Sequence, residues 1–219
     1  MLHILVYSDS LSWGIVPATR RRLPFDARWP GVMEITLQAR ARAGSTVRVI
    51  EDCLNGRRTV WDDPYKPGRN GLQGLSQRIE IYSPLALVIL MLGTNDFQSM
   101  HPHTAWHAAL GMGTLVGAVR QAPIEPGMPV PPVLVVAPPP LRAAQGPIAR
   151  KFAAADVKSA GLAAAYGELC GELGCHFFDA GAVVSTSAVD GIHLDADQHL
   201  VLGRALADCV ATLGVVPAS

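Results

Sequence analysis

"HILVYSDSLSWG" (residues 3–14) opens the chain and carries an apolar run directly into a polar turn. The run Ile4-Leu5-Val6-Tyr7 is apolar at every position, which is typical of a strand that is covered on both faces. The turn after it holds three serines, Ser8, Ser10 and Ser12. The stretch therefore predicts a buried parallel strand that ends in serines, one of which is a candidate nucleophile.

Four further apolar runs have the same character, and segments with helical periodicity separate them. The predicted strands cover residues 3–8, 47–52, 86–92, 132–137 and 175–180. The predicted helices cover residues 29–43, 71–82, 104–121, 155–173 and 195–213, the last beginning at Asp195, a residue type that favours the N-cap. This alternation predicts an α/β fold in which a parallel sheet has helices on both faces. Nothing repeats internally, so we expect one domain over residues 1–219.

Composition excludes several classes of protein. Hydrophobic residues make up 49% of the 219 residues and charged residues 16%, which is enough apolar material for a core and argues against disorder. Eighteen basic side chains balance eighteen acidic ones, so no nucleic-acid partner is expected, and the run Arg20-Arg21-Arg22 is interpreted as a solvated loop.

Cellular location is predicted from the absence of targeting signals and from the cysteines. No apolar run approaches the roughly 18 residues of a membrane span, and no secretory signal begins the chain. The four cysteines lack the spacing of a metal site. We therefore expect reduced thiols in a cytoplasmic protein with no membrane partner.

Chemically useful side chains follow the ends of successive strands. Ser10 follows the first strand, Gly56 the second and Asn95 the third, while Asp190 and His193 follow the fifth at a short distance. Because parallel strands place their carboxyl ends at one edge, we expect these residues to meet. A serine hydroxyl becomes a nucleophile when an imidazole takes its proton and a carboxylate orients the imidazole. Backbone N–H groups and an amide side chain can stabilise the resulting oxyanion, so the set favours acyl transfer.

Four short motifs carry a resemblance to a known family. "SDSLSWG", "NGRRT", "LGTND" and "DGIH" occur in the order and at the spacing of the SGNH/GDSL hydrolase superfamily. The segments "PLALVILMLGTND", "VLVVAPPPL" and "VDGIHL" are similar to its arylesterase and acyltransferase (perhydrolase-like) branch, and the resemblance covers residues 3–213. It implies a three-layer α/β/α fold with a five-stranded parallel sheet in the order 2-1-3-4-5.

The resemblance also implies a role for each site residue. Ser10 would be the nucleophile, His193 the general base and acid, and Asp190 the partner that orients His193. The N–H groups of Ser10 and Gly56 and the side chain of Asn95 would form the oxyanion hole. One alternative is a silent binding module, which would lack a member of this set, and none is missing.

One position departs from the family pattern. Ser8 stands where the family usually has glycine, two residues before the predicted nucleophile. If the backbone there requires a positive φ, serine is strained; if it does not, a small side chain simply fits. No catalytic group is lost in either case, and Ser8 and Ser12 are then interpreted as turn residues.

The resemblance implies a small-molecule substrate. We expect short-chain carboxylic esters, aryl esters in particular, with acyl transfer to alcohols or peroxide as side reactions. A carbohydrate acetylesterase or a thioesterase of the same superfamily is the alternative. The expected substrate-binding residues are mostly apolar: Leu11, Trp13, Ile15, Leu141, Phe152 and Ile192.

No cofactor or metal is expected. His101, His103 and His107 are closely spaced, but no carboxylate-rich set joins them, so they are interpreted as surface residues. The apolar fraction and the mean hydropathy of +0.25 predict a homo-oligomer, with the nearly uncharged segment 121–132 as a candidate interface. Alanine-rich helices in a monomer are the competing explanation for that composition.

Overall fold

Five strands form one parallel sheet at the centre of the computed structural model, which describes residues 1–215. Their spatial order is β2-β1-β3-β4-β5, and every neighbouring pair is parallel, which confirms the expected α/β sheet. No predicted strand end is wrong by more than one residue. The strands are β1 (Leu2–Ser8), β2 (Val47–Cys53), β3 (Leu87–Met91), β4 (Val133–Ala137) and β5 (His176–Asp179).

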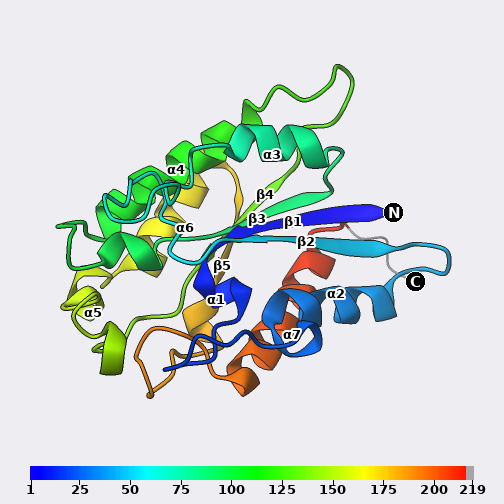
Figure 1. The fold of residues 1–219 in the computed structure, drawn as a ribbon. Coiled ribbons are helices and arrows are strands. Elements are labelled where there is room, and N and C mark those ends of the chain that lie inside the picture. Colours follow the sequence, from blue (N-terminus) through cyan, green and yellow to red (C-terminus); the bar gives the residue numbers. More distant parts are fainter. Residues whose placement is uncertain (216–219) are drawn as a thin grey trace.

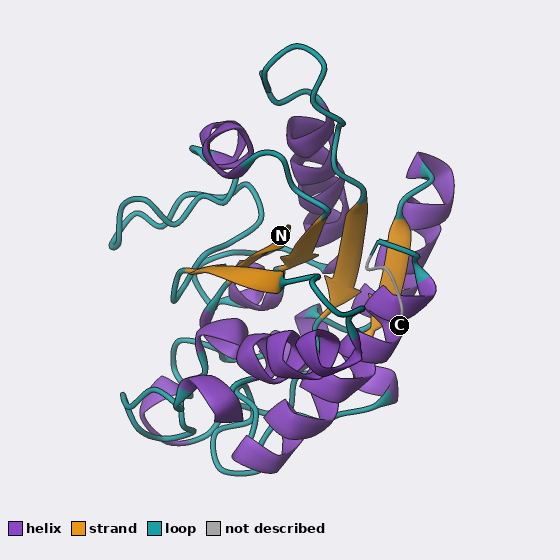
Figure 2. Cartoon of the chain, turned by 90° about the vertical axis from the view of Figure 1, so that its right-hand side faces the viewer, coloured by secondary structure: helices purple, strands orange, loops and turns teal. Residues whose placement is uncertain are grey.

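Helices cover both faces of the sheet, as Figures 1 and 2 show. On one face lie α2 (Trp29–Arg40) and α7 (Ala196–Thr212), and on the other lie α3 (Leu75–Tyr82), α4 (Ala105–Arg120) and α6 (Leu162–Leu173). Successive side chains of a strand point to opposite faces. Ile4 and Val6 therefore pack with α2 and α7, whereas Leu5 and Tyr7 pack with the other layer. The continuous apolar run of β1 is explained by these two cores.

Three predicted helices differ from those of the structure, and glycine explains two of the differences. The segment 155–173 is broken into α5 (Ala155–Lys158) and α6, because Gly161 between them has a φ of +81°. The helix expected from residue 71 begins only at Leu75, after Gly74 with a φ of +77°. Left-handed backbone of this kind interrupts an α-helix and favours glycine. The helix expected over 29–43 ends at Arg40, where extended backbone follows.

The last helix begins where expected, although its N-cap works differently. Asp195 has the extended backbone of an N-cap residue, but its side chain makes no cap hydrogen bond to α7. Its carboxylate instead accepts a hydrogen bond from the Ser187 hydroxyl at 2.9 Å. This contact ties the start of α7 to the loop that carries Asp190 and His193, so the residue helps to position the candidate site.

Two other expectations concern the thiols and the membrane. All four cysteines are free, which agrees with the expected reduced thiols. No helix among the described residues is long and apolar enough to cross a membrane.

Candidate active site

Ser10 is the first residue of the short helix α1 (Ser10–Trp13), which starts directly after β1. Asp9 caps this helix, because its Oδ1 accepts the N–H of Leu11 at 2.9 Å. Gly14, with a φ of +84°, ends the helix after one turn. The sharp change from strand to helix places the Ser10 hydroxyl at the edge of the sheet, where it lines a cavity of about 100 Å³. Its side chain is nearly buried, with 6% of the residue exposed.

His193 connects Ser10 to Asp190. Its Nε2 lies 3.2 Å from the Ser10 Oγ, and its Nδ1 lies 2.7 Å from the Asp190 Oδ2. The other oxygen of Asp190 accepts the N–H groups of Ile192 and His193, each at 2.9 Å. The structure thus brings together three side chains that are up to 183 positions apart in the sequence. With Nδ1 bound to a carboxylate, Nε2 is free to accept the serine proton.

Asp190 is ionised because of its hydrogen bonds. Burial alone would raise its pKa, but the hydrogen bond from His193, the charge of His193 and the two N–H groups outweigh burial and lower the pKa to about 2. The carboxylate therefore keeps its charge throughout the neutral range and can stabilise an imidazolium at His193.

Gly56 and Asn95 line the same cavity as Ser10 and His193. Gly56 has a φ of +88°, a backbone conformation that favours glycine, and a Cβ there would have room. Asn95 lies in the short 3-10 helix η2 (Thr94–Phe97), which follows β3. The expected oxyanion donors, including Ser10, are thus collected at one cavity by the carboxyl ends of β1, β2 and β3.

A chain of buried hydrogen bonds orients the Asn95 amide. Arg58 donates to the Gln98 Oε1 at 2.6 Å, and the Gln98 Nε2 donates to the Asn95 Oδ1 at 2.8 Å. The Asn95 Nδ2 then donates to the Asp9 Oδ2 at 2.9 Å. Arginine can only donate and an ionised carboxylate can only accept, so the two ends set the direction of the whole chain. One N–H of Asn95 is left for the cavity. Neither Gln98 nor Arg58 was predicted from the sequence to contribute to the site.

Ser8 fits its position without strain. It is not among the residues with a positive φ, so a glycine is not required there. The Trp29 Nε1 donates to the Ser12 Oγ at 3.1 Å, the Ser8 and Ser12 hydroxyl oxygens lie 2.5 Å apart, and Ser8 donates to the Met91 carbonyl at 2.6 Å. Ser8 and Ser12 are therefore buried partners of each other, and neither faces the cavity with Ser10.

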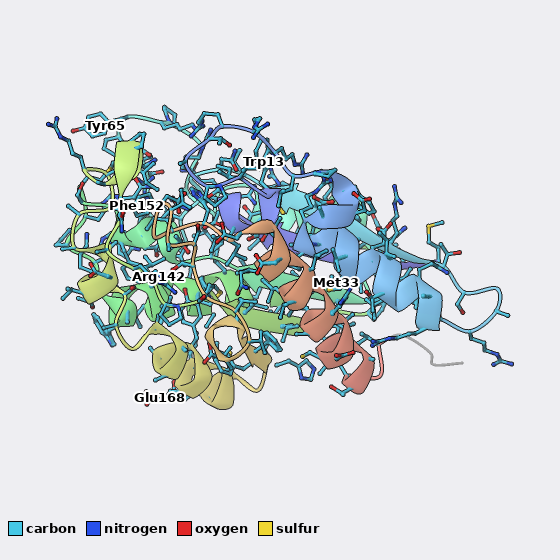
Figure 3. All side chains as sticks on the ribbon, turned by 90° about the horizontal axis from the view of Figure 1, so that it is seen from below. Trp13, Met33, Tyr65, Arg142, Phe152 and Glu168 are labelled. Carbon is cyan, nitrogen blue, oxygen red and sulfur yellow. The ribbon has the colours of Figure 1, made fainter. Side chains whose placement is uncertain are left out.

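The six expected substrate-binding residues do not all lie at this cavity. Ile15 and Phe152 line it, and Phe152 is labelled in Figure 3 at the end of the molecule away from Met33. Leu11 and Ile192 are buried in the two cores. Leu141 lines a separate cavity of about 140 Å³, and Trp13 lines a surface depression beneath the guanidinium of Arg22. Five lining residues were not foreseen: Arg20, Asn55, Lys66, Ile148 and Lys151.

The histidine cluster is packed and does not hold a metal arrangement. His103 is only 8% exposed and stacks between Trp61 and His101, with ring centroids 4.0 and 4.7 Å away, so the expectation of a surface residue was wrong for His103. The capping-box contact of His107 with Thr104 starts α4. Within residues 1–215, no group of three or more His, Cys, Asp or Glu side chains could hold a metal ion.

Known proteins resemble this chain over nearly its full length. The sequence model of the GDSL-like Lipase/Acylhydrolase family matches residues 9–201. The native aryl esterase of M. smegmatis is 40% identical, with a TM-score of 0.90 over 97% of this chain and 100% of that chain. Est24, a carbohydrate acetylesterase from Sinorhizobium meliloti, is 39% identical with the same TM-score and coverage. No curated protein sequence is significantly similar. The chain belongs to the GDSL-like lipase/acylhydrolase family and is a carboxylic ester hydrolase.

Proposed function

We propose that the chain hydrolyses short-chain carboxylic esters through an acyl-enzyme formed on Ser10. The observation that carries this proposal is the continuous contact from the Ser10 hydroxyl through His193 to the Asp190 carboxylate. The similarity to an aryl esterase supports an ester substrate, and the similarity to a carbohydrate acetylesterase supports a small acyl group.

In the first half of the reaction, the Ser10 Oγ attacks the ester carbonyl carbon while the His193 Nε2 takes the hydroxyl proton. The carbonyl π electrons move to its oxygen, and this oxyanion accepts hydrogen bonds from the N–H groups of Ser10 and Gly56 and from the Asn95 amide. Collapse of the tetrahedral intermediate breaks the bond to the alcohol, which receives the proton from His193. Asp190 holds the imidazole in the required tautomer throughout.

In the second half, water attacks the acyl carbon while His193 takes one of its protons. Collapse of this second tetrahedral intermediate breaks the ester bond to Ser10, which receives the proton from His193, and releases the carboxylic acid. An alcohol or hydrogen peroxide that reaches the acyl-enzyme in place of water gives a new ester or a peracid. Ile15, Ile148 and Phe152 make part of the cavity wall apolar, which favours an alcohol over water as the acceptor. Acyl transfer is therefore proposed as a side activity of the same site.

Carbohydrate acetylesterase activity is a second candidate. The cavity wall also carries polar side chains, Arg20, Asn55 and Lys66, which can bind hydroxyl groups. Among the described residues that line this cavity, Phe152 is the single phenylalanine, tyrosine or tryptophan, so an extended sugar-stacking platform is lacking. Release of acetate from peracetylated glucose, compared with release from phenyl acetate, decides between the two substrate classes.

The deciding experiment measures 4-nitrophenyl acetate hydrolysis by the wild type and by Ser10→Ala and His193→Ala. Both variants should lose several orders of magnitude in kcat. Ser185→Ala is the matched control, because Ser185 is exposed and outside the cavity. A phosphonate inhibitor should add its mass to the wild type and not to Ser10→Ala. Near-normal turnover of Ser10→Ala would reject the proposal.

We also propose that the protein is a homo-oligomer. The described surface carries several exposed apolar side chains, including Val130 and Met128 in the candidate interface segment 121–132 and Trp106 on α4. Burial of such side chains between subunits removes apolar surface from water.

A further inference from the structure

Three cationic side chains surround the cavity that holds Ser10. Arg20, Lys66 and Lys151 all line it, and none of the described residues that line it is acidic. The whole chain has eighteen basic and eighteen acidic side chains, so the excess at this cavity is local and does not follow from the composition. A local excess of positive charge at a substrate cavity bears on the charge of the ligand that binds there.

Each cation comes from a different loop. Arg20 lies between α1 and α2, Lys66 between β2 and α3, and Lys151 between β4 and α5. Figure 3 shows Tyr65 and Phe152, the neighbours of the two lysines, at the same end of the molecule. Backbone contacts hold the loops: the N–H of Lys66 donates to the Asp63 carbonyl, and the carbonyl of Lys151 accepts the N–H of Ser99. Three loops that are far apart in the sequence thus deliver like charges to one cavity.

None of these three side chains has an ion-pair partner among the described residues. Other basic residues nearby are paired, since Arg57 binds Asp52 and Arg58 binds Asp63. Asp63 is the acidic group that acts on both lysines, but its carboxylate already lies 3.0 Å from the Arg58 Nη1. Of the other carboxylates at the site, Asp190 is bound to His193 and Asp9 to the Asn95 amide. Asp63 therefore offsets the charge of the two lysines only from a distance, and none of the three cations is held in an ion pair among the described residues.

Electrostatic effects on the two lysines agree with this description. Partial desolvation lowers the pKa of Lys151. The charge of Asp63 raises this pKa, and the charges of three neighbouring cations, Arg58, Lys66 and Arg20, lower it. Desolvation also lowers the pKa of Lys66, together with the charges of Arg69 and Arg20. Like charges held at close range repel each other, and a bound anion would relieve that repulsion.

We propose that Arg20, Lys66 and Lys151 select esters that carry a negative charge, such as a carboxylate, beside the scissile bond. The inference rests on the proposed function, because it assigns a substrate class to the same site. A cavity lined by one sign of charge raises the local concentration of oppositely charged substrate and holds it once bound. The three residues are specificity-determining and take no part in the proton transfers between Ser10 and His193.

The anion can be on either side of the ester bond. Lys66 and Lys151 line the cavity that contains the candidate oxyanion donors Gly56 and Asn95. Arg20 lines this cavity and also an adjoining one of about 180 Å³. That second cavity is also lined by His193, which protonates the leaving alcohol, and by the carboxylate of Asp190, which is bound to His193. A carboxylate on the acyl group and a carboxylate on the alcohol group are therefore tested separately.

The experiment uses two pairs of esters. For the alcohol side, 4-acetoxybenzoate is compared with its neutral methyl ester, and (4-acetoxyphenyl)trimethylammonium provides the opposite charge. For the acyl side, mono-4-nitrophenyl succinate is compared with 4-nitrophenyl butyrate after subtraction of spontaneous hydrolysis. The quantity measured is the ratio of kcat/KM for the anionic ester to kcat/KM for the neutral ester. The two esters differ in intrinsic reactivity, but this difference is the same for every variant and cancels when the ratio of a variant is compared with that of the wild type.

The variant is the triple substitution Arg20→Gln, Lys66→Gln and Lys151→Gln. It should lower this ratio by about tenfold or more for at least one pair, and about 0.5 M salt should lower it several-fold in the wild type. The cationic ester should gain relative to the neutral one in the same variant. Arg204→Gln is the matched control, because Arg204 is exposed on α7, and it should leave the ratio unchanged.

The outcomes separate this inference from the proposed function. An equal ratio in the wild type and the triple variant for both pairs overturns the charge selection, whatever the rate on neutral esters. Neutral ester hydrolysis that survives Ser10→Ala overturns the proposed function instead. If the ratio falls for one pair of esters and not for the other, the pair that responds identifies the side of the ester that carries the anion.

Discussion

The carboxylate of Asp9 binds the side-chain amide of Asn95 at 2.9 Å while its other oxygen caps the helix that carries Ser10. One buried side chain thus positions both the candidate nucleophile and a candidate oxyanion donor. Burial raises the pKa of Asp9 to about 6, against the lowering effects of the Leu11 N–H, the charge of His193 and Asn95. At neutral pH the side chain is mainly ionised and accepts both hydrogen bonds.

Asp9→Asn should lower kcat by about 10- to 100-fold with a smaller effect on KM. Asparagine offers one acceptor oxygen where two N–H donors arrive, from Leu11 and from Asn95, so one of the two contacts is lost. Steady-state kinetics on 4-nitrophenyl acetate measures the effect. If Asp9 acts through Asn95, the double variant Asp9→Asn with Asn95→Ala should have nearly the same kcat as Asn95→Ala alone. Asp208→Asn, at a surface ion pair on α7, is the control.

Asn95→Ala should itself reduce kcat by about 100- to 1,000-fold, the loss measured for a single oxyanion donor elsewhere. KM should change little, because the hydrogen bond strengthens only as the carbonyl oxygen becomes charged. The measurement is again kcat and KM on a neutral aryl acetate. A raised KM with an unchanged kcat would indicate that Asn95 binds the ground state and the transition state equally and is not an oxyanion donor.

The buried strand-end residues were predictable from the sequence for a physical reason. A strand covered on both faces is apolar throughout, so β1, β3 and β4 are recognisable as continuous runs. The carboxyl ends of parallel strands share one edge, which is why Ser10, Asn95 and His193 could be expected to meet. The order of the strands came from the resemblance and is confirmed, because hydropathy alone does not specify which strands are neighbours.

The substrate-contacting residues were less predictable, because position in the sequence is a poor guide to direction in space. Leu11 follows the candidate nucleophile directly, yet the helical rotation of about 100° per residue turns it into the core. Arg20, Lys66 and Lys151 lie on irregular loops, where no periodicity predicts which side chains face the cavity. Arg20 was interpreted as part of a solvated run, and it is exposed, but it also lines the site.

Acyl-chain preference follows from the size of the two cavities. The cavity at Ser10 holds about 100 Å³ and the adjoining one about 180 Å³, and Ile15, Ile148 and His193 line both. We expect the fastest hydrolysis for acetyl to butyryl esters and a steep fall by octanoyl. A series of 4-nitrophenyl esters from C2 to C12, measured as kcat/KM, checks this. A maximum at C8 or beyond would favour a lipase or thioesterase role.

Asp96 should make stability depend on pH. Burial raises its pKa to about 7, although hydrogen bonds from the Thr59 hydroxyl and N–H and the charge of Arg58 lower it. Between pH 3.8, its ordinary pKa, and pH 7 the folded protein holds a proton that the unfolded chain has released. The free energy of unfolding therefore falls as the pH rises through this window.

Asp96→Asn removes this titration. The difference in free energy of unfolding, variant minus wild type, should rise between pH 4 and pH 7 and level off above it. Urea denaturation across this pH range measures the difference, with Asp26→Asn at the exposed surface as the control. A pH-independent difference would show that Asp96 stays ionised in the folded state.

The segment 121–132 should bury apolar surface between subunits. It projects as a loop between α4 and β4 (Figure 1), and Val130 is 53% exposed there. In a monomer, a charged residue at this exposed position stays in water, so its substitution for valine has little effect on stability. In a subunit interface the same charge would be desolvated, which disfavours association. Val130→Glu should therefore lower the molar mass measured by light scattering during gel filtration, while Val201→Glu, at a similarly exposed valine on α7, should not. A wild-type mass of one chain, constant over about a hundredfold range of concentration, would reject the homo-oligomer, because association follows mass action.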